Sequence, residues 1–334
     1  MAKDLHNQVV LMRGFGLTRW IGLLLLGAGA ASANVTLFLE EPYGTFGGMN
    51  PTGHAAVYFS NICAATPTKL RHCNEGERGV VISRYHRVAG YDWLAIPLLP
   101  YLYAVDDADQ VPLSVTPRDV ESLRDQWRRH HLIDIVPDAD DGAPPQGDWV
   151  QLVGSAYDRT LYAFEVPSTP EQDDRFIEML NAKPNVSHFN LLFHNCADFA
   201  RQMIDYYYPH AVHRNLFADV GIMTPKQAAR SLVSYSRKHE ISMEMLTIPQ
   251  VAGTIPRSTA VRGVLQSLVK SKRYAIPLAG LAVFHPFFGG GMVAAWVQGK
   301  SFDPKKIAGK ADPDKDPQAI AMELQTSDAW TGGQ

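Results

Sequence analysis

The chain has 334 residues, of which 46% are hydrophobic, enough for one large domain or two smaller domains with a real core. The formal net charge of -3 gives no sign of the basic surface that nucleic-acid-binding proteins usually carry, so we expect no nucleic-acid partner. The three cysteines occur without a CxxC pattern and no HExxH pattern is present, so neither a metal nor another cofactor is expected.

Residues 1–33 have the layout of a secretory signal peptide. Three basic residues precede a short apolar run at 21–30, and Ala31-Ser32-Ala33 fits a small-x-small cleavage site. The run is shorter than the roughly 20 apolar residues of a spanning helix. We therefore expect export to the periplasm or cell envelope, with an uncleaved membrane anchor as the alternative.

The elements predicted after this segment are short strands and well-marked helix starts. Apolar or alternating runs predict strands at 35–39, 54–59, 79–88, 159–166 and 241–248. Three Thr-Pro pairs, at 116–117, 169–170 and 224–225, each combine an N-cap residue with a proline at the first helical position. Residues 91–105 contain two prolines, which oppose a regular helix and suggest a packed crossing segment or a substrate-facing wall. This order predicts an α+β domain over residues 34–250.

Residues 251–300 form a separate apolar segment. No charged side chain occurs from Tyr274 to Gly299, which is long enough to span a membrane. Pro277, the His285-Pro286 pair and three consecutive glycines oppose a continuous helix. Two alternatives stay open: spanning or re-entrant membrane insertion, and packing on the soluble domain. Residues 301–334 are polar and predicted to be disordered.

The three cysteines have different expected roles. Cys63 and Cys73 lie ten positions apart between two predicted strands, and in an exported protein we expect them to form a disulfide. Cys196 is then left over. It can be a buried hydrophobic side chain, a bridge between two chains or a free reactive thiol.

Cys196 begins a predicted amphipathic helix. Apolar side chains recur at helical spacing from Cys196 to Tyr207, Pro209 ends the pattern and Asn195 can serve as N-cap. The partial positive charge and unpaired N–H groups of a helix start favour a thiolate and can hold a developing oxyanion. Cys196 is therefore a candidate nucleophile.

A nucleophilic thiol needs a base, and His54 is the candidate. It follows Gly53 and a glycine-containing loop and begins the strand 54–59. If this strand pairs with 79–88 as an antiparallel hairpin, with residue 59 opposite about residue 80, either Tyr85 or His86 lies beside His54. His86 is the preferred third residue, which would orient the ring. An ordinary strand-end histidine at 54 and a surface histidine at 86 are the alternatives.

The order of these motifs resembles the circularly permuted papain-like proteins of the NlpC/P60 superfamily. Gly53-His54 opens a "GHAAVYF" strand, and Asn195-Cys196 opens an "NCADFA" helix downstream of it. The permuted branch includes lecithin-retinol acyltransferase-like proteins and periplasmic domains of lipoprotein transacylases. The resemblance covers roughly residues 35–210. It implies an antiparallel sheet with packed helices, Cys196 as nucleophile and His54 as base.

Together these features predict an exported cysteine-dependent enzyme that breaks an amide or ester bond through a thioester on Cys196. Water as acceptor makes it a hydrolase, such as a thiol protease acting on cell-wall peptides, and an amine or hydroxyl acceptor makes it an acyltransferase. The apolar segments favour a lipid or lipoprotein acyl substrate and membrane association. The alternative is a non-catalytic envelope protein that uses the same cleft for binding.

Overall fold

The computed structural model describes residues 33–44, 51–86, 88–309 and 316–326. The signal-peptide prediction falls outside these residues, except for Ala33. The strands are β1 (Ala33–Glu40), β2 (His54–Phe59), β3 (Ile62–Thr66), β4 (Lys69–His72), β5 (Val80–Ser83), β6 (Leu94–Pro97), β7 (Ser114–Val115), β8 (Leu161–Ser168), β9 (Glu244–Ile248) and β10 (Ala252–Gly253).

The helices are α2 (Leu98–Tyr103), α3 (Pro117–His131), α4 (Ser155–Asp158), α5 (Pro170–Ala182), α6 (Cys196–Tyr207), α7 (Pro225–His239), α8 (Val264–Lys270), α9 (Lys272–Phe284), α10 (Pro286–Lys300), α11 (Pro304–Ile307) and α12 (Pro317–Thr326). Two short 3-10 helices, η1 (Ala108–Gln110) and η2 (Asp148–Gln151), lie in the connections.

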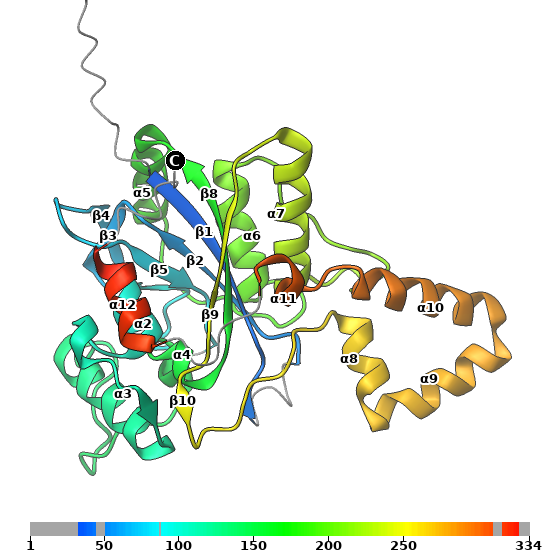
Figure 1. Ribbon diagram of the computed structural model, residues 1–334, viewed down its shortest axis with the longest axis horizontal. Coiled ribbons are helices and arrows are strands. Elements are labelled where there is room, and N and C mark those ends of the chain that lie inside the picture. The colour runs from blue at the N-terminus through cyan, green and yellow to red at the C-terminus, as the bar shows by residue number, and fades with distance from the viewer. Residues whose placement is uncertain (1–32, 45–50, 87, 310–315, 327–334) are drawn as a thin grey trace, which may run out of the picture. The chain divides into compact units, whose positions relative to one another are not determined.

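A six-stranded antiparallel sheet carries the fold, in the order β6-β5-β2-β1-β8-β9 (Figure 1). The predicted combination of an antiparallel sheet with helices is therefore present. β2 has the predicted bounds, and its pairing with β5 places Phe59 opposite Val80, as the hairpin prediction requires. The connection between them also forms a hairpin of its own, β3 with β4, which the sequence did not reveal.

Helices cover both faces of the sheet. Successive side chains of the central strands are apolar and point to opposite faces, so both faces must be buried. On one face, Phe38 and Tyr58 belong to a core shared with α2, α3 and α12. On the other, Leu37 and Phe59 belong to a core shared with α5, α6 and α7. Figure 1 shows α6 and α7 beside β1 and β8. Both faces of the strands are thus buried, and the first turn of α6 lies against the beginning of β2.

The three predicted helix starts are confirmed. The side chains of Thr116, Thr169 and Thr224 each accept a backbone N–H from the first turn of α3, α5 and α7, and each is followed by a proline. Such caps satisfy N–H groups that have no partner within the helix.

Residues 91–105 form β6 and the six-residue α2 instead of a long helix. Pro100 is accommodated in the first turn of α2, where a missing N–H costs little. Tyr101, Leu102 and Tyr103 are buried in the core. The segment is therefore a packed crossing, and it does not line the cavity described below.

The apolar segment near the C-terminal end forms two helices, α9 and α10, with a break at His285. Within the described residues, none of the helices has the length and apolar character needed to cross a membrane.

The polar tail, predicted to be disordered, instead forms α11 and α12 in its described part. Ile320 and Leu324 of α12 are buried in the core beside α2, and the Arg78 guanidinium donates to the carbonyl of Gln325 at 2.6 Å. Ala321 is buried with them, so α12 docks on the core through apolar residues at helical spacing.

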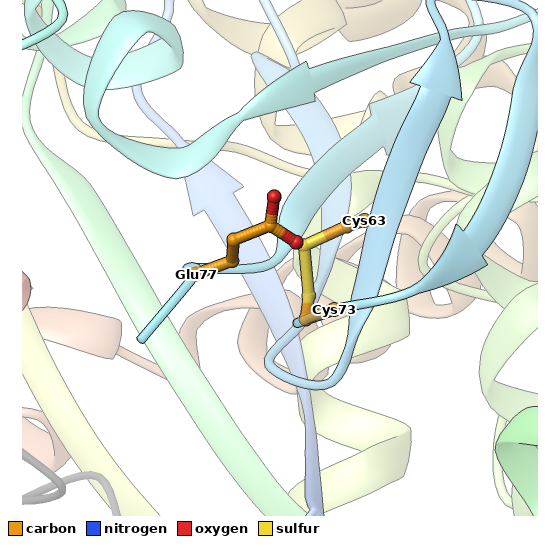
Figure 2. A group of neighbouring side chains, drawn as sticks. All are labelled: Cys63, Cys73 and Glu77. Carbon is orange, nitrogen blue, oxygen red and sulfur yellow. A yellow bond between two sulfur atoms is a disulfide. The ribbon is translucent and has the colours of Figure 1, made fainter. Parts of the chain in front are cut away.

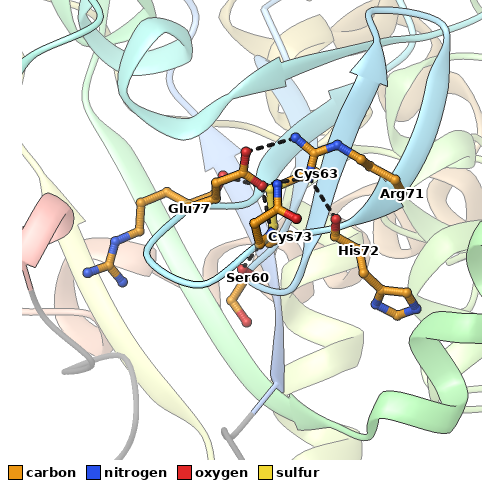
Figure 3. Close-up of a disulfide and its surroundings, with 8 residues drawn as sticks. Ser60, Cys63, Arg71, His72, Cys73 and Glu77 are labelled. Atoms are coloured by element: carbon orange, nitrogen blue, oxygen red, sulfur yellow. Dashed lines mark hydrogen bonds and ion pairs between the residues drawn. A yellow bond between two sulfur atoms is a disulfide. The ribbon is translucent and has the colours of Figure 1, made fainter.

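The predicted disulfide is present. Cys63 of β3 and Cys73, directly after β4, are joined by an S–S bond of 2.03 Å, so the bond closes the β3–β4 hairpin (Figure 3). Arg71 of the same hairpin donates to the Glu77 carboxylate at 2.5 and 2.8 Å. The connection between β2 and β5 is therefore held by a covalent bond and an ion pair.

Candidate functional site

Cys196 is the first residue of α6, as the sequence predicts. Asn195 caps the helix: its side chain accepts the Asp198 N–H at 2.9 Å, and the Asp198 carboxylate accepts the Asn195 N–H at 3.4 Å. The Asn195 amide also donates to the carbonyls of Leu191 and Met223, at 3.0 Å each. The cap thus fixes the helix start and two neighbouring loops at once.

The Cys196 sulfur lies against the beginning of β2. It accepts hydrogen bonds from the backbone N–H groups of Ala55 and Ala197, and these bonds lower the pKa of the thiol. Burial outweighs them, because only 6% of the residue is exposed, and raises the pKa to about 11. The helix start was expected to favour a thiolate, but desolvation keeps the resting group a neutral thiol.

His54 begins β2, one residue before the backbone that contacts the sulfur. Its Nε2 lies 2.8 Å from the Ser83 hydroxyl, which also lies 2.8 Å from the Ala55 carbonyl. The carbonyl can only accept, so the hydroxyl proton goes to it and Nε2–H donates to Ser83. The lone pair of His54 is then on Nδ1. The ring stacks on Tyr85, with centroids 4.8 Å apart. The hydrogen bond at its edge and the stacking on its face together fix the orientation of the ring.

Gly53 lets the chain enter β2 at this point. It adopts φ +82°, and a Cβ atom there would lie 2.1 Å from the backbone oxygen of Glu40. Only glycine combines this conformation with this close approach. The position of His54 therefore depends on Gly53.

A buried ion pair lies behind His54. Glu40, opposite His54 across the β1–β2 pairing, lies 3.0 Å from the Arg159 guanidinium and accepts the Tyr101 hydroxyl. Both charged residues are almost completely buried. Burial lowers the pKa of His54 well below its ordinary value, and the positive charge of Arg159 lowers it further. His54 is therefore neutral near pH 7, as a general base must be.

His86, the predicted third residue, has other partners in the structure. Its Nδ1 faces Asp148 at 3.6 Å, its ring lies beside Phe189, and nearly half of its side chain is exposed. Ser83 and Tyr85 contact the His54 ring instead. Continued along the strands, the β2–β5 register places residue 85 opposite residue 54. Residue 83 lies on the same face and residue 86 on the other, because successive side chains of a strand point to opposite faces.

His54, Cys196 and His86 all line one cavity of about 660 Å³. The structure thus brings together two motifs that are 142 positions apart. Among the described residues, the hydrogen bond of the His54 ring goes to Ser83 and not to the sulfur. Catalytic hydrogen bonds are often long in the absence of substrate and shorten when it binds.

The wall of the cavity is largely apolar. Phe189, Leu191, Leu192, Ile222 and Met223 come from the loops before α6 and before α7, and further residues come from α8 and the start of α9. A cavity with an apolar wall and a few converging polar groups is the usual form of a small-molecule site.

One group of residues has the composition of a metal site, but its chemistry does not fit. Figure 2 shows Cys63, Cys73 and Glu77, the metal-ligand cluster found among the described residues. The two sulfurs are bonded to each other, and metal binding needs thiolates. The hydrogen bond from Arg71 lowers the pKa of the Glu77 carboxyl to about 2 and occupies it. The cluster therefore belongs to the disulfide hairpin.

Comparisons of the chain with protein-family models, with curated proteins and with solved structures found no match. The chemistry of the site has to follow from its own residues.

Proposed function

We propose that the protein is a cysteine-dependent acyl-transfer enzyme, a hydrolase or an acyltransferase, with Cys196 as nucleophile and His54 as general base. One observation carries this proposal: the Cys196 thiol at a capped helix start and the oriented His54 ring line the same cavity. The order of the two motifs, and the antiparallel sheet with helices, support a permuted papain-like architecture of the NlpC/P60 type.

The first step would form a thioester. The Cys196 S–H proton passes to Nδ1 of His54 while the sulfur attacks the substrate carbonyl carbon. The Cys196 N–H, which has no hydrogen-bond partner among the described residues, is placed to donate to the resulting oxyanion. The tetrahedral intermediate then expels the amine or alcohol, which takes the proton back from His54.

The second step releases the acyl group. Water, an amine or a hydroxyl attacks the thioester carbonyl, and His54 accepts the proton of this attacking group. The tetrahedral intermediate then breaks its C–S bond, and the leaving Cys196 sulfur takes the proton from His54, which restores the neutral thiol and ring. Because burial keeps Cys196 a thiol and His54 neutral, the resting pair would be uncharged. Proton transfer would then accompany attack instead of preceding it.

The apolar cavity wall favours an acyl chain over a hydrophilic peptide as the bound part of the substrate. Lipid or lipoprotein acyl groups therefore come before cell-wall peptides as candidates. Export remains part of the proposal, and the Cys63–Cys73 disulfide supports an oxidising compartment.

The test is capture of the acyl-enzyme with p-nitrophenyl esters of acetate and octanoate. We expect a burst of p-nitrophenol, a mass increase of one acyl group on Cys196, and faster acylation by octanoate. Cys196→Ala should abolish the adduct, and His54→Gln should slow its formation by about 10²- to 10⁴-fold, the usual contribution of a general base.

His86→Gln is the matched control, because His86 lines the same cavity while its ring lies beside Asp148 and Phe189. It should acylate at nearly the rate of the unmodified protein. If the folded protein forms no adduct on Cys196 with either ester, the enzyme proposal fails and the non-catalytic binding protein becomes the better account.

A further inference from the structure

Helices α9 and α10 expose large apolar side chains on an unusual scale. Ile276, Phe284 and Phe287 are 78%, 82% and 98% exposed, and the last two flank the break between the helices. From Tyr274 to Gly299 there is no charged residue, so neither helix has a charged face. A helix that is apolar all round is normally buried in a protein core or in a membrane.

The exposed apolar residues continue onto two loops beside the cavity. In the loop before α6, Asn190 holds a tight turn by accepting the N–H groups of Leu192 and Phe193, and this turn exposes Leu191, Leu192 and Phe193. Leu216 and Phe217 are about three-quarters exposed on the loop before α7. We call these five residues, together with α9 and α10, the apolar surface.

Specific contacts connect the parts of the apolar surface. The Arg214 guanidinium lies over the Phe193 ring, 5.5 Å from its centroid, which joins the two loops. The Leu265 N–H donates to the Ala218 carbonyl at 3.3 Å, which joins the second loop to α8. Leu191, Leu192 and Tyr274 also line the cavity, so the apolar surface reaches the cavity wall.

The part of the chain that contains α8, α9 and α10 carries only positive charge in its sequence. No aspartate or glutamate occurs between Glu244 and Asp303. The basic residues of this stretch are Arg257, Arg262, Lys270, Lys272, Arg273 and Lys300. Lys300 lies over the Trp296 ring at 3.6 Å, at the end of α10 that leads back to the domain. Basic and aromatic residues beside an apolar segment are typical of proteins at an anionic membrane surface.

The lengths of α9 and α10 determine how far they could extend into a bilayer. α9 has 13 residues and α10 has 15, which corresponds to about 20 Å each at 1.5 Å per residue. This is shorter than the roughly 30 Å hydrocarbon core. The break keeps its hydrogen bonds, because the His285 N–H donates to Leu281 and the Gly289 N–H donates to the His285 carbonyl, each at 2.9 Å. A helical hairpin with few unpaired backbone groups can enter hydrocarbon from one side and return.

We propose that α9 and α10 insert as a re-entrant hairpin into one leaflet of an anionic phospholipid bilayer. The two apolar loops then rest at the same surface, and the cavity opens toward lipid. This proposal is independent of the thiol chemistry, since it involves neither Cys196 nor His54.

The experiment places a probe at the hairpin tip in the full chain. Cys196→Ser with Phe287→Cys leaves one unpaired thiol, which is labelled with a nitrobenzoxadiazole maleimide. On vesicles of phosphatidylcholine with 30% phosphatidylglycerol, we expect a blue shift of the probe and quenching by lipids that carry doxyl groups on their acyl chains. The matched control carries the label at Leu113→Cys, an apolar position that is 57% exposed and directly precedes β7, and should show neither change.

Two further variants test the apolar and the charged contributions. Adding Phe284→Asp to the chain labelled at 287 should raise the lipid concentration for half-maximal blue shift by about 10-fold or more, because a buried aromatic side chain is replaced by a charge. Lys270→Ser with Lys300→Ser should raise it by about 5-fold per residue on the anionic vesicles, and not on pure phosphatidylcholine.

The proposal is overturned if the probe at 287 remains in water on vesicles that bind the protein. It is also overturned if the blue shift occurs without lipid and follows protein concentration, because the hairpin would then contact a second copy of the chain. Failure of acyl-enzyme formation leaves this test unchanged, so the two proposals can fail separately.

Discussion

At the scale of single residues, the site depends on how burial and hydrogen bonds set proton positions. Cys196 and His54 are both nearly inaccessible, and burial shifts their pKa values in opposite directions, each toward the neutral form. A helix start alone favours a thiolate, but here desolvation is the larger effect.

The pH dependence of alkylation tests this balance. Because the pKa of Cys196 is raised to about 11, its reaction with iodoacetamide at pH 7.5 should be slower than that of a free thiol, whose pKa is about 8.5. The rate should rise about tenfold per pH unit up to pH 10, measured by mass spectrometry. In urea, the alkylation rate should again follow the pH dependence of an ordinary free thiol. A plateau below pH 8.5 in the folded protein would contradict the neutral thiol.

Ser83 is predicted to act as a positioning residue. Ser83→Ala removes the acceptor for Nε2–H of His54 and frees the ring to adopt the other tautomer. We expect thiol acylation to slow by about 10- to 100-fold, less than the roughly 10⁴-fold loss when a buried carboxylate partner is removed. The ester concentration for half-maximal rate should stay the same, and Ser83→Thr should restore most of the rate. A change in half-maximal concentration alone would indicate a merely structural role.

The residues of the site were only partly predictable. Helical periodicity and the Asn195 cap place Cys196, and the strand pattern with Gly53 places His54. Ser83 was missed because a serine within an apolar strand has no distinctive pattern, although the predicted register already puts residue 83 on the same face as residue 54. The signal would have been a small polar residue, here Ser83, two positions from Tyr85, the predicted cross-strand neighbour of His54.

At the scale of elements, the β8–β9 pair contains an unfavourable arrangement of charge. Glu165 of β8 lies directly opposite Glu244 of β9 and is buried. Burial, reinforced by the charge of Glu244, raises the pKa of Glu165 to about 8 from an ordinary value of 4.5, although a hydrogen bond from Thr36 opposes this. The folded state therefore binds a proton that the unfolded state loses above pH 4.5.

This arrangement predicts a loss of stability with rising pH. The contribution of protonated Glu165 is complete below about pH 4.5 and is lost as the pH rises through about 8. Glu165→Gln should remove this dependence and stabilise the protein at pH 9 by about 2–4 kcal/mol relative to the unmodified chain. Urea unfolding at pH 5 and pH 9 measures the effect. Equal slopes of stability against pH in both chains would contradict it.

Elements with local signals were predictable, and elements made by tertiary contacts were not. The Thr-Pro caps of α3, α5 and α7 depend on the nearest four residues, so their starts were predicted correctly. β3 and β4 are short and partly exposed, and α12 is a short helix after a polar stretch of the tail. Leu70 of β4 binds Asn181 of α5, and Ile320 of α12 is buried in the core beside α2. These distant contacts add to the stability of the elements, and no local pattern reveals them.

At the scale of the whole molecule, α12 completes one of the two cores. Ile320→Ala should destabilise the protein by about 2–4 kcal/mol, as expected for a buried isoleucine. Leu113→Ala, at an exposed position, should change the free energy of unfolding by less than about 0.5 kcal/mol. Urea unfolding of both variants provides the comparison, and similar midpoints would mean that α12 is not part of the cooperative unit.

The docking of α12 also bears on how the chain acquires its fold. Arg78 binds the carbonyl of Gln325, 247 positions away, and β1 pairs with β8 across more than a hundred residues. Contacts this distant must wait for loop closure, which slows folding. During synthesis or export, most of the polypeptide would emerge before α12, which completes one of the two cores. Until α12 docks, the apolar core beside α2 would be exposed to solvent, and a chaperone could protect it from aggregation.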